Sequence, residues 1–246
     1  MKDRIDFVIA GVQKAGTTSL DGTLRRHPRL CLSEKKELHF FDRLGFVASE
    51  EAYRSYHLEG WKREKFDEAC MFGEATPKYG AVHKNSRVPY LHRIQTYNPD
   101  IRLIFVFRDP VERVFSQWWM GFRTGNTQES FRDFVRNRRR AIPEVQARNP
   151  LARGYYGTLV KEARRLFPSE HLKFLKFEDR EAWLMDVWNF LGVDFQEDVA
   201  LEHSNEGKGK PGLDPDFAAE LRRFYADEVR LFEELTGMDC TNWKGS

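Results

Sequence analysis

Apolar and polar positions along the chain predict strands that alternate with helices. Short apolar runs stand at residues 7–10, 103–107 and 172–177, and each reads as a strand. Helical patterns cover residues 17–27, 84–97, 111–122, 128–140, 155–167, 180–191 and 215–236. The run at 103–107 is continuously apolar, as expected for a strand buried on both faces. This alternation predicts an α/β fold with a central, mostly parallel sheet and helices on both faces.

Length and composition narrow the class of protein. The chain has 246 residues, 41% of them hydrophobic, so it can bury a full core, and we expect a single domain over residues 1–246. A formal net charge of +2 argues against a nucleic-acid partner. Three cysteines without a paired spacing favour reduced thiols and a cytoplasmic location. No apolar run reaches the ~20 residues of a membrane span, and the first residues lack a leader pattern.

The segment GVQKAGTTSL at residues 11–20 follows the first apolar run and has the glycine spacing of a phosphate-binding loop. Gly11 and Gly16 match the glycines of GxxxxGK[ST], and Thr18 holds the hydroxyl position. The lysine position is occupied by Thr17, which argues against a nucleoside triphosphatase. Lys14 lies inside the turn instead. Because N–H groups at a helix start favour anions, we expect a phosphate-like group beside Lys14; the alternative is a solvated lysine in a glycine-rich turn.

A second polar segment follows the apolar run at 103–107. In RLIFVFRDPVERVFSQWW, Asp109 and Pro110 form a good helix start, with a carboxylate N-cap and a proline at the first helical position. Arg108 then stands at the carboxyl end of a buried strand, where open α/β sheets bind ligands. Ser116 returns to the same region about two turns later. A guanidinium with a nearby hydroxyl suits a phosphate monoester, although Arg108 pairing with Asp109 or Glu112 is the simpler interpretation.

Taken together, GVQKAGTTSL and FVFRDPVERVFS resemble the two nucleotide-binding motifs of sulfotransferases that use 3′-phosphoadenosine 5′-phosphosulfate (PAPS). The segments RRHPRLCLSEKKELHFFD (25–42), GEATPKY (73–79) and GKGKPGLD (207–214) are similar to the heparan sulfate sulfotransferase branch and occur in its order. The resemblance covers residues 7 to about 214. It implies the P-loop-like sulfotransferase fold and transfer of a sulfuryl group from PAPS to a hydroxyl, with adenosine 3′,5′-bisphosphate (PAP) as product.

The resemblance also implies which residues bind the nucleotide. Lys14 would contact the oxygen that joins phosphorus to sulfur, because PAPS has no β or γ phosphate for a lysine at position 17. Arg108 and Ser116 would hold the 3′-phosphate. The full expected nucleotide-binding set is Lys14, Ala15, Gly16, Thr17, Thr18, Ser19, Arg108, Ser116, and the late-loop residues Lys208, Gly209 and Lys210.

On the acceptor side, Glu37 in KKELHFF matches the family's catalytic glutamate and is the expected general base. His39 is the alternative base, because imidazole titrates near neutral pH, or else it orients a neighbour. Glu74, Lys78 and Asp42 are expected to bind the acceptor or orient Glu37. No metal is expected, since cationic side chains can supply the charge that magnesium supplies in a kinase.

The identity of the acceptor stays open, and two other functions compete. We expect a hydroxyl of a small-molecule natural product, a lipid or a saccharide. The first alternative is a P-loop nucleoside kinase with a displaced lysine, which ATP and magnesium would protect thermally where PAP would not. The second is a non-catalytic nucleotide- or polyanion-binding module, whose affinity for a polyanion would fall steeply with salt.

Overall fold

The computed structural model describes residues 4–43, 49, 52, 70–83, 88–140, 149–201 and 209–244. Within them, five parallel strands form one sheet in the order β2-β3-β1-β4-β5. The strands are β1 (Phe7–Gly11), β2 (Leu30–Leu32), β3 (Met71–Ala75), β4 (Arg102–Phe107) and β5 (Leu172–Lys176). The predicted parallel sheet is therefore confirmed, and the order places β1 at its centre.

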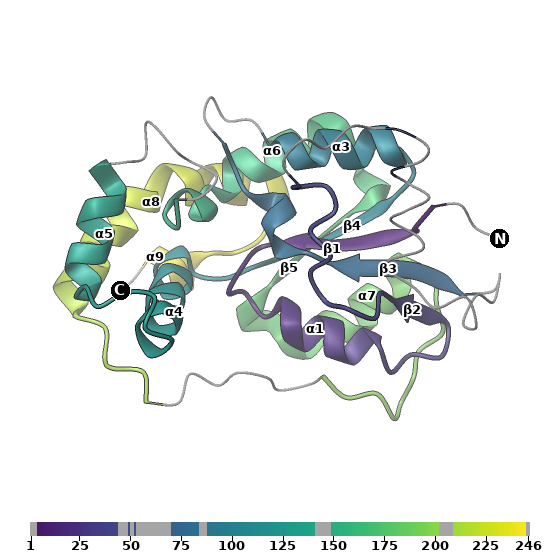
Figure 1. Ribbon diagram of the computed structural model, residues 1–246, viewed down its shortest axis with the longest axis horizontal. Coiled ribbons are helices and arrows are strands. Elements are labelled where there is room, and N and C mark those ends of the chain that lie inside the picture. Colours follow the sequence, from purple (N-terminus) through teal and green to yellow (C-terminus); the bar gives the residue numbers. More distant parts are fainter. Residues whose placement is uncertain are drawn as a thin grey trace.

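Helices cover both faces of the sheet, as predicted. Figure 1 shows α1 and α7 on one side of the strands and α3 and α6 on the other, with α4, α5 and α8 on the side to which the β3 arrow points. The helices are α1 (Thr17–Leu24), α3 (Pro89–Tyr97), α4 (Pro110–Arg123), α5 (Phe131–Arg140), α6 (Tyr156–Leu166), α7 (Trp183–Leu191), α8 (Pro215–Thr236) and α9 (Thr241–Lys244). Short 3-10 helices include η2 (Pro77–Gly80), η5 (Ala152–Gly154) and η7 (Phe177–Ala182). The carboxyl ends of the strands thus face α4.

Packing within the central strands explains an unusual residue in β3. Every residue of β1 is buried, and Phe7 is paired with Gly73. A Cβ atom at Gly73 would lie 2.2 Å from Cζ of Phe7, so only glycine leaves room for this ring. Strand β3 also carries Glu74 into the interior, where it is fully buried. A polar residue inside a sheet needs partners there, and these are described with the candidate site.

The start of α4 has the cap that the sequence predicts. The Asp109 carboxylate accepts hydrogen bonds from two backbone N–H groups of the first turn, at 2.8 and 3.3 Å, and Pro110 takes the first helical position. The backbone N–H of Asp109 donates to Glu178 at 3.0 Å. Burial raises the pKa of Asp109. The hydroxyl of Tyr156 donates to the Arg108 carbonyl at 2.8 Å, so both sides of the β4–α4 junction are fixed.

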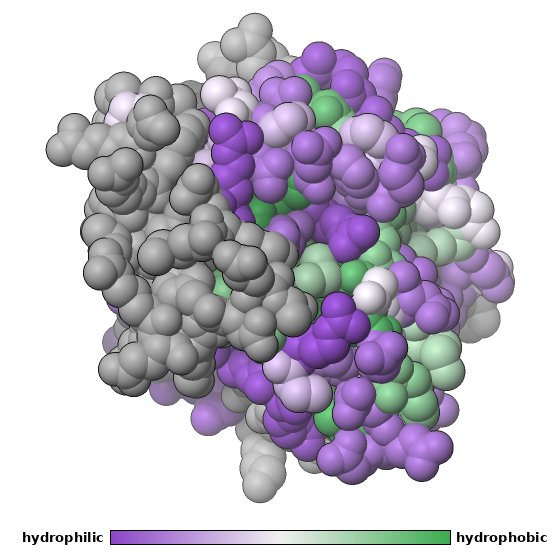
Figure 2. All heavy atoms as spheres, turned by 90° about the vertical axis from the view of Figure 1, so that its right-hand side faces the viewer, coloured by the Kyte–Doolittle hydropathy of each residue, from purple (hydrophilic) through white to green (hydrophobic). Residues whose placement is uncertain are grey.

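Figure 2 shows the end of the molecule that lies at the right of Figure 1. Over the coloured part of that face, hydrophilic residues predominate and hydrophobic residues appear between them. In the described part of the chain, no helix combines the length and apolar character needed to cross a membrane.

Candidate active site

The turn between β1 and α1 is shaped by its backbone and by one glycine. The N–H of Val12 donates to the carbonyl of Val106 in β4 at 2.8 Å, which ties the turn to the neighbouring strand. Gly16 has a φ of 93°, and a Cβ atom there would lie 3.0 Å from the rings of both Phe177 and Trp183. No side chain caps α1, so the N–H groups of its first turn are not occupied by a capping group. The turn has the properties of an anion site.

Lys14 points from this turn toward α4. Its backbone has a φ of 71°, and its Nζ donates to Sδ of Met120 at 3.5 Å. The pKa of Lys14 lies below its ordinary value, chiefly because of burial and further because of four positive side chains: Arg108, Lys36, Arg113 and Arg123. Cationic groups therefore converge on the turn. An anion bound there would relieve their mutual repulsion.

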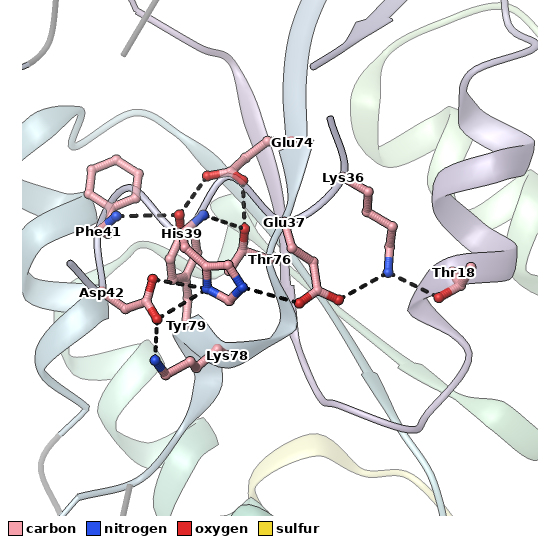
Figure 3. A network of polar contacts seen from close by, with 10 residues as sticks. All are labelled: Thr18, Lys36, Glu37, His39, Phe41, Asp42, Glu74, Thr76, Lys78 and Tyr79. Atoms are coloured by element: carbon pink, nitrogen blue, oxygen red, sulfur yellow. Dashed lines mark hydrogen bonds and ion pairs between the residues drawn. The ribbon is translucent and has the colours of Figure 1, made fainter. Parts of the chain in front are cut away.

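Lys36 links the turn to the predicted base, as Figure 3 shows. Its Nζ donates to Oγ1 of Thr18 at 3.0 Å and lies 3.3 Å from Oε1 of Glu37. The backbone of Glu37 has a φ of 61°, and its N–H donates to the carbonyl of Ala75 at the end of β3, at 3.0 Å. The predicted base is therefore held at the carboxyl edge of the sheet, beside the turn.

A chain of polar contacts continues from Glu37 on the side away from Lys36 (Figure 3). Nε2 of His39 lies 3.4 Å from Oε2 of Glu37, and Nδ1 of His39 lies 3.1 Å from each oxygen of Asp42. Nζ of Lys78 approaches Asp42 to 2.5 Å. The Asp42 carboxylate thus fixes the imidazole ring in place, and the ring in turn abuts Glu37. The structure brings these four predicted residues together.

Glu74 is the predicted acceptor-side residue that lies inside the protein. It is fully buried, and its two oxygens accept hydrogen bonds from Oγ1 of Thr76 at 2.7 Å and from the Tyr79 hydroxyl at 2.8 Å. Burial holds the pKa of Tyr79 well above its ordinary value. Thr76 Oγ1 in turn lies 3.4 Å from the backbone nitrogen of His39. Of the two roles predicted for Glu74, these contacts favour orienting its neighbours, because the buried carboxylate is linked through Thr76 to the backbone of His39.

Arg108 lies at a cavity that adjoins the turn. Its guanidinium stacks over Phe177, 4.7 Å from the ring centre, and its Nη2 lies 3.5 Å from Oε2 of Glu112. The same Phe177 ring abuts Gly16 in the turn. The cavity has a volume of about 440 Å³ and is lined by Arg108, Glu112, Phe177, Glu178, Arg180 and Glu181. The Phe177 ring therefore lies between the turn that follows β1 and Arg108, the residue predicted to bind the 3′-phosphate.

The remaining predicted nucleotide residues lie on α4 and in the late loop. Ser116 is partly buried on α4. Gly209 has a φ of 69°, and the neighbouring Lys210 donates from Nζ to Oε2 of Glu112 at 2.7 Å. Lys208 lies outside the described residues. The late loop therefore reaches α4 through Lys210.

Three residues near the site are not among those predicted from the sequence: Lys36, Phe177 and Arg153. Nε of Arg153 is buried and has no hydrogen-bond partner among the described residues. Burial lowers the pKa of Arg153 to about 10, the charge of Arg113 adds to that effect, and the charge of Glu37 opposes it. In the sequence, Lys36 stands beside a glutamate and Arg153 stands alone. Both patterns are typical of solvated charges, so no sequence signal identifies these two residues. No potential metal site made of His, Cys, Asp and Glu is found in the described ranges.

The parallel sheet, the glycine turn after β1 and the basic segment after β4 define a P-loop-like α/β protein. The sequence matches the sulfotransferase family over residues 6–197, and the chain belongs to this family. The family predicted from the motifs is therefore confirmed.

Three comparisons place the chain within the family. It is 28% identical to mouse heparan sulfate glucosamine 3-O-sulfotransferase 3A1 over 97% of this chain and 64% of that protein. It is 33% identical to the Dictyostelium discoideum membrane-associated sulfotransferase kil1 over 46% of this chain, so it spans only 22% and 64% of these two relatives. The crystal structure of a sulfotransferase from Alicyclobacillus acidocaldarius superposes with a TM-score of 0.78 at 28% identity, covering 98% of this chain and 99% of that one. The predicted similarity to the heparan sulfate branch is confirmed.

Proposed function

We propose that this chain transfers a sulfuryl group from PAPS to a hydroxyl of an acceptor molecule. The family to which it belongs uses PAPS as donor. The observation that carries the proposal is the position of Lys36, which contacts Thr18 in the first turn of α1 and Glu37 beside β3. Lys36 is thus the only side chain between the predicted donor site and the predicted base along this path of contacts. Direct transfer between two bound molecules requires such proximity.

The donor would bind across the turn and the cavity beside it. The 5′-phosphosulfate would lie against the N–H groups of the first turn of α1, with Lys14 at the oxygen between phosphorus and sulfur. The 3′-phosphate would lie at Arg108 and Ser116. Support for this orientation comes from the Phe177 ring, which touches both the turn and Arg108. The convergence of cations at Lys14 supports an anionic donor there.

The proposed chemistry is an in-line displacement at sulfur. Glu37 takes the proton of the acceptor hydroxyl, and the acceptor oxygen forms a bond to sulfur. The bond between sulfur and the bridging oxygen breaks, and its electron pair leaves with PAP. The Lys14 ammonium offsets the negative charge that grows on that oxygen. The transferred sulfur group, the proton and the electron pair are all accounted for without a further reactant.

His39 is assigned the task of holding Glu37. Its ring is fixed by Asp42 on one side and abuts the Glu37 carboxylate on the other. His39→Asn should therefore lower kcat less than Glu37→Gln does. If His39 were the base, His39→Asn would lower kcat more than Glu37→Gln does.

A saccharide hydroxyl is the first acceptor to test, because the names of several relatives specify the glucosamine of heparan sulfate. Small natural products and lipids with free hydroxyls form the other arms of the panel. Purified protein would be incubated with PAPS and each acceptor. Mass spectrometry would follow the added sulfate, and chromatography would follow release of PAP.

Matched variants separate chemistry from folding. Glu37→Gln should lower kcat by roughly 10²- to 10⁴-fold, the usual contribution of a positioned general base. Lys14→Ala should also remove most turnover. Glu34→Gln makes the same chemical change three residues away on an exposed side chain, and it should retain activity. Near-normal sulfate transfer by both Lys14→Ala and Glu37→Gln would refute the proposed chemistry.

A further inference from the structure

One carboxylate oxygen holds together two cations from distant parts of the chain. Oε2 of Glu112 accepts from Nζ of Lys210 at 2.7 Å and lies 3.5 Å from Nη2 of Arg108. Lys210 comes from the late loop, and it also lies 4.3 Å above the ring centre of Phe115. Glu112 and Arg108 flank the start of α4. The proposed function places the 3′-phosphate at Arg108, and the family resemblance implies that Lys210 also binds the nucleotide.

The cavity that Glu112 lines contains other charged side chains. The cavity beside Arg108 also contains Glu178 and Glu181, so it holds three acidic and two basic side chains. Glu178 accepts from the backbone N–H of Asp109 at 3.0 Å and is committed to the α4 cap. Within the described residues, the Glu112 carboxylate contacts only Arg108 and Lys210. A phosphate monoester that reaches Nη2 of Arg108 would therefore compete with the Glu112 carboxylate for this donor.

We propose that Glu112 is a nucleotide-release residue, whose carboxylate competes with the 3′-phosphate for Arg108 and Lys210. The inference rests on the proposed function, because it takes the 3′-phosphate to bind at Arg108, and it adds Lys210 as a second cation at that phosphate. PAPS and PAP share this phosphate, so tight binding of the donor would also retain the product. A carboxylate that reclaims both cations lowers the affinity for both nucleotides and shortens the time for which PAP stays bound.

An opposite role for Glu112 is physically reasonable and gives the opposite result. A carboxylate that fixes Arg108 and Lys210 in the right place would preorganise the site for phosphate. Its removal would then loosen both side chains and weaken PAP binding. The sign of the change in affinity therefore separates competition from preorganisation.

The test is calorimetric titration of PAP and of AMP into the wild-type protein and Glu112→Gln. Glutamine has nearly the same shape and can still accept from Lys210, so the late loop can keep its place. Glu112→Gln should bind PAP roughly five- to tenfold more tightly, as expected for loss of one partly exposed ion-pair competitor. The affinity for AMP, which lacks the 3′-phosphate, should not change. Steady-state kinetics should show a lower KM for PAPS together with a lower kcat.

Two further variants complete the design. Glu220→Gln removes a carboxylate that pairs with Arg139 at 3.2 Å on the surface of α8, so it controls for the change in net charge. Lys210→Gln removes one contested cation, and in that background Glu112→Gln should tighten PAP binding by a smaller factor. Unchanged or weaker PAP binding by Glu112→Gln, or equal tightening for AMP or by Glu220→Gln, overturns the inference. Wild-type protein that binds PAP no better than AMP would instead refute the 3′-phosphate assignment of the proposed function.

Discussion

Replacing Gly16 by alanine tests whether the turn between β1 and α1 depends on its close contact with Phe177 and Trp183. Gly16 has a φ of 93°, and an added Cβ would lie 3.0 Å from the rings of Phe177 and Trp183. Two costs follow. The backbone must hold a side-chain-bearing residue in the left-handed region, and two aromatic rings must move. We therefore expect Gly16→Ala to lower both the stability of the fold and the affinity for nucleotide.

The magnitude follows from these two costs. A left-handed conformation costs a residue with a Cβ about 1–2 kcal/mol. Overpacking of a filled interior adds about 1–3 kcal/mol. The sum is a loss of about 2–5 kcal/mol in the free energy of unfolding. Since 1 kcal/mol shifts the melting temperature of a chain of this size by about 2–4 °C, Gly16→Ala should melt roughly 4–20 °C lower.

Gly125→Ala is the matched control, because Gly125 has a φ of 74° but nothing within 4 Å of its added Cβ. It carries the backbone cost alone and should melt only about 2–8 °C lower. Scanning calorimetry gives both melting temperatures, and titration with PAP gives both affinities. Only Gly16→Ala should weaken PAP binding, because the displaced Phe177 ring also supports Arg108. Equal melting temperatures and equal PAP affinities for the two variants would refute the packing argument.

Three further outcomes are expected. Burial and neighbouring positive charges lower the pKa of Lys14 below 10.5, so its ammonium loses a proton at lower pH than a free lysine. The alkaline fall of kcat/KM should therefore begin below pH 10.5 and should move to higher pH in Lys14→Arg. An unchanged pH profile in that variant would exclude Lys14 as the group that titrates. Arg108→Ala should weaken PAP binding roughly 10- to 100-fold, the loss of one charge-assisted contact, and leave AMP binding unchanged in calorimetry; equal losses for both nucleotides would contradict the assignment. Glu74→Ala leaves the buried hydroxyls of Thr76 and Tyr79 without their acceptor. The free energy of unfolding, measured in urea, should therefore fall by about 2–5 kcal/mol. Unchanged stability would contradict the described network.

The strands differ in how far the sequence predicts them. Strands β1, β4 and β5 are predicted because their apolar runs are dense enough to be recognised alone. The run at 172–177 extends one residue too far, since β5 ends at Lys176 and Phe177 begins η7. Strands β2 and β3 were not predicted. Strand β2 has only three residues, which is too short for a recognisable pattern. Strand β3 contains Gly73 and Glu74, which are explained by the space that the Phe7 ring needs and by the buried hydroxyls that bind Glu74.

The candidate site divides in a similar way. Lys14 and Glu37 stand out because they lie in motifs with fixed spacing, although their catalytic roles stay predictions. The contact between Lys36 and Thr18 was not predictable from residues that are 18 positions apart on separate segments. The contact of Lys210 with Glu112 joins residues 98 positions apart. Such pairs depend on the order of strands in the sheet, which the pattern of apolar residues does not encode.

The bridge made by Lys36 has a consequence for redesigning the acceptor range. The segment that carries Glu37 also carries the lysine that contacts Thr18 of α1, so under the proposed function one side chain links the donor site to the base. A chimera in which this segment comes from a relative without the lysine would lack the contact that Lys36 makes with Glu37. The segment that carries Glu37 and the segment that carries Thr18 should therefore be exchanged together, so that the contacts of residue 36 with both are kept.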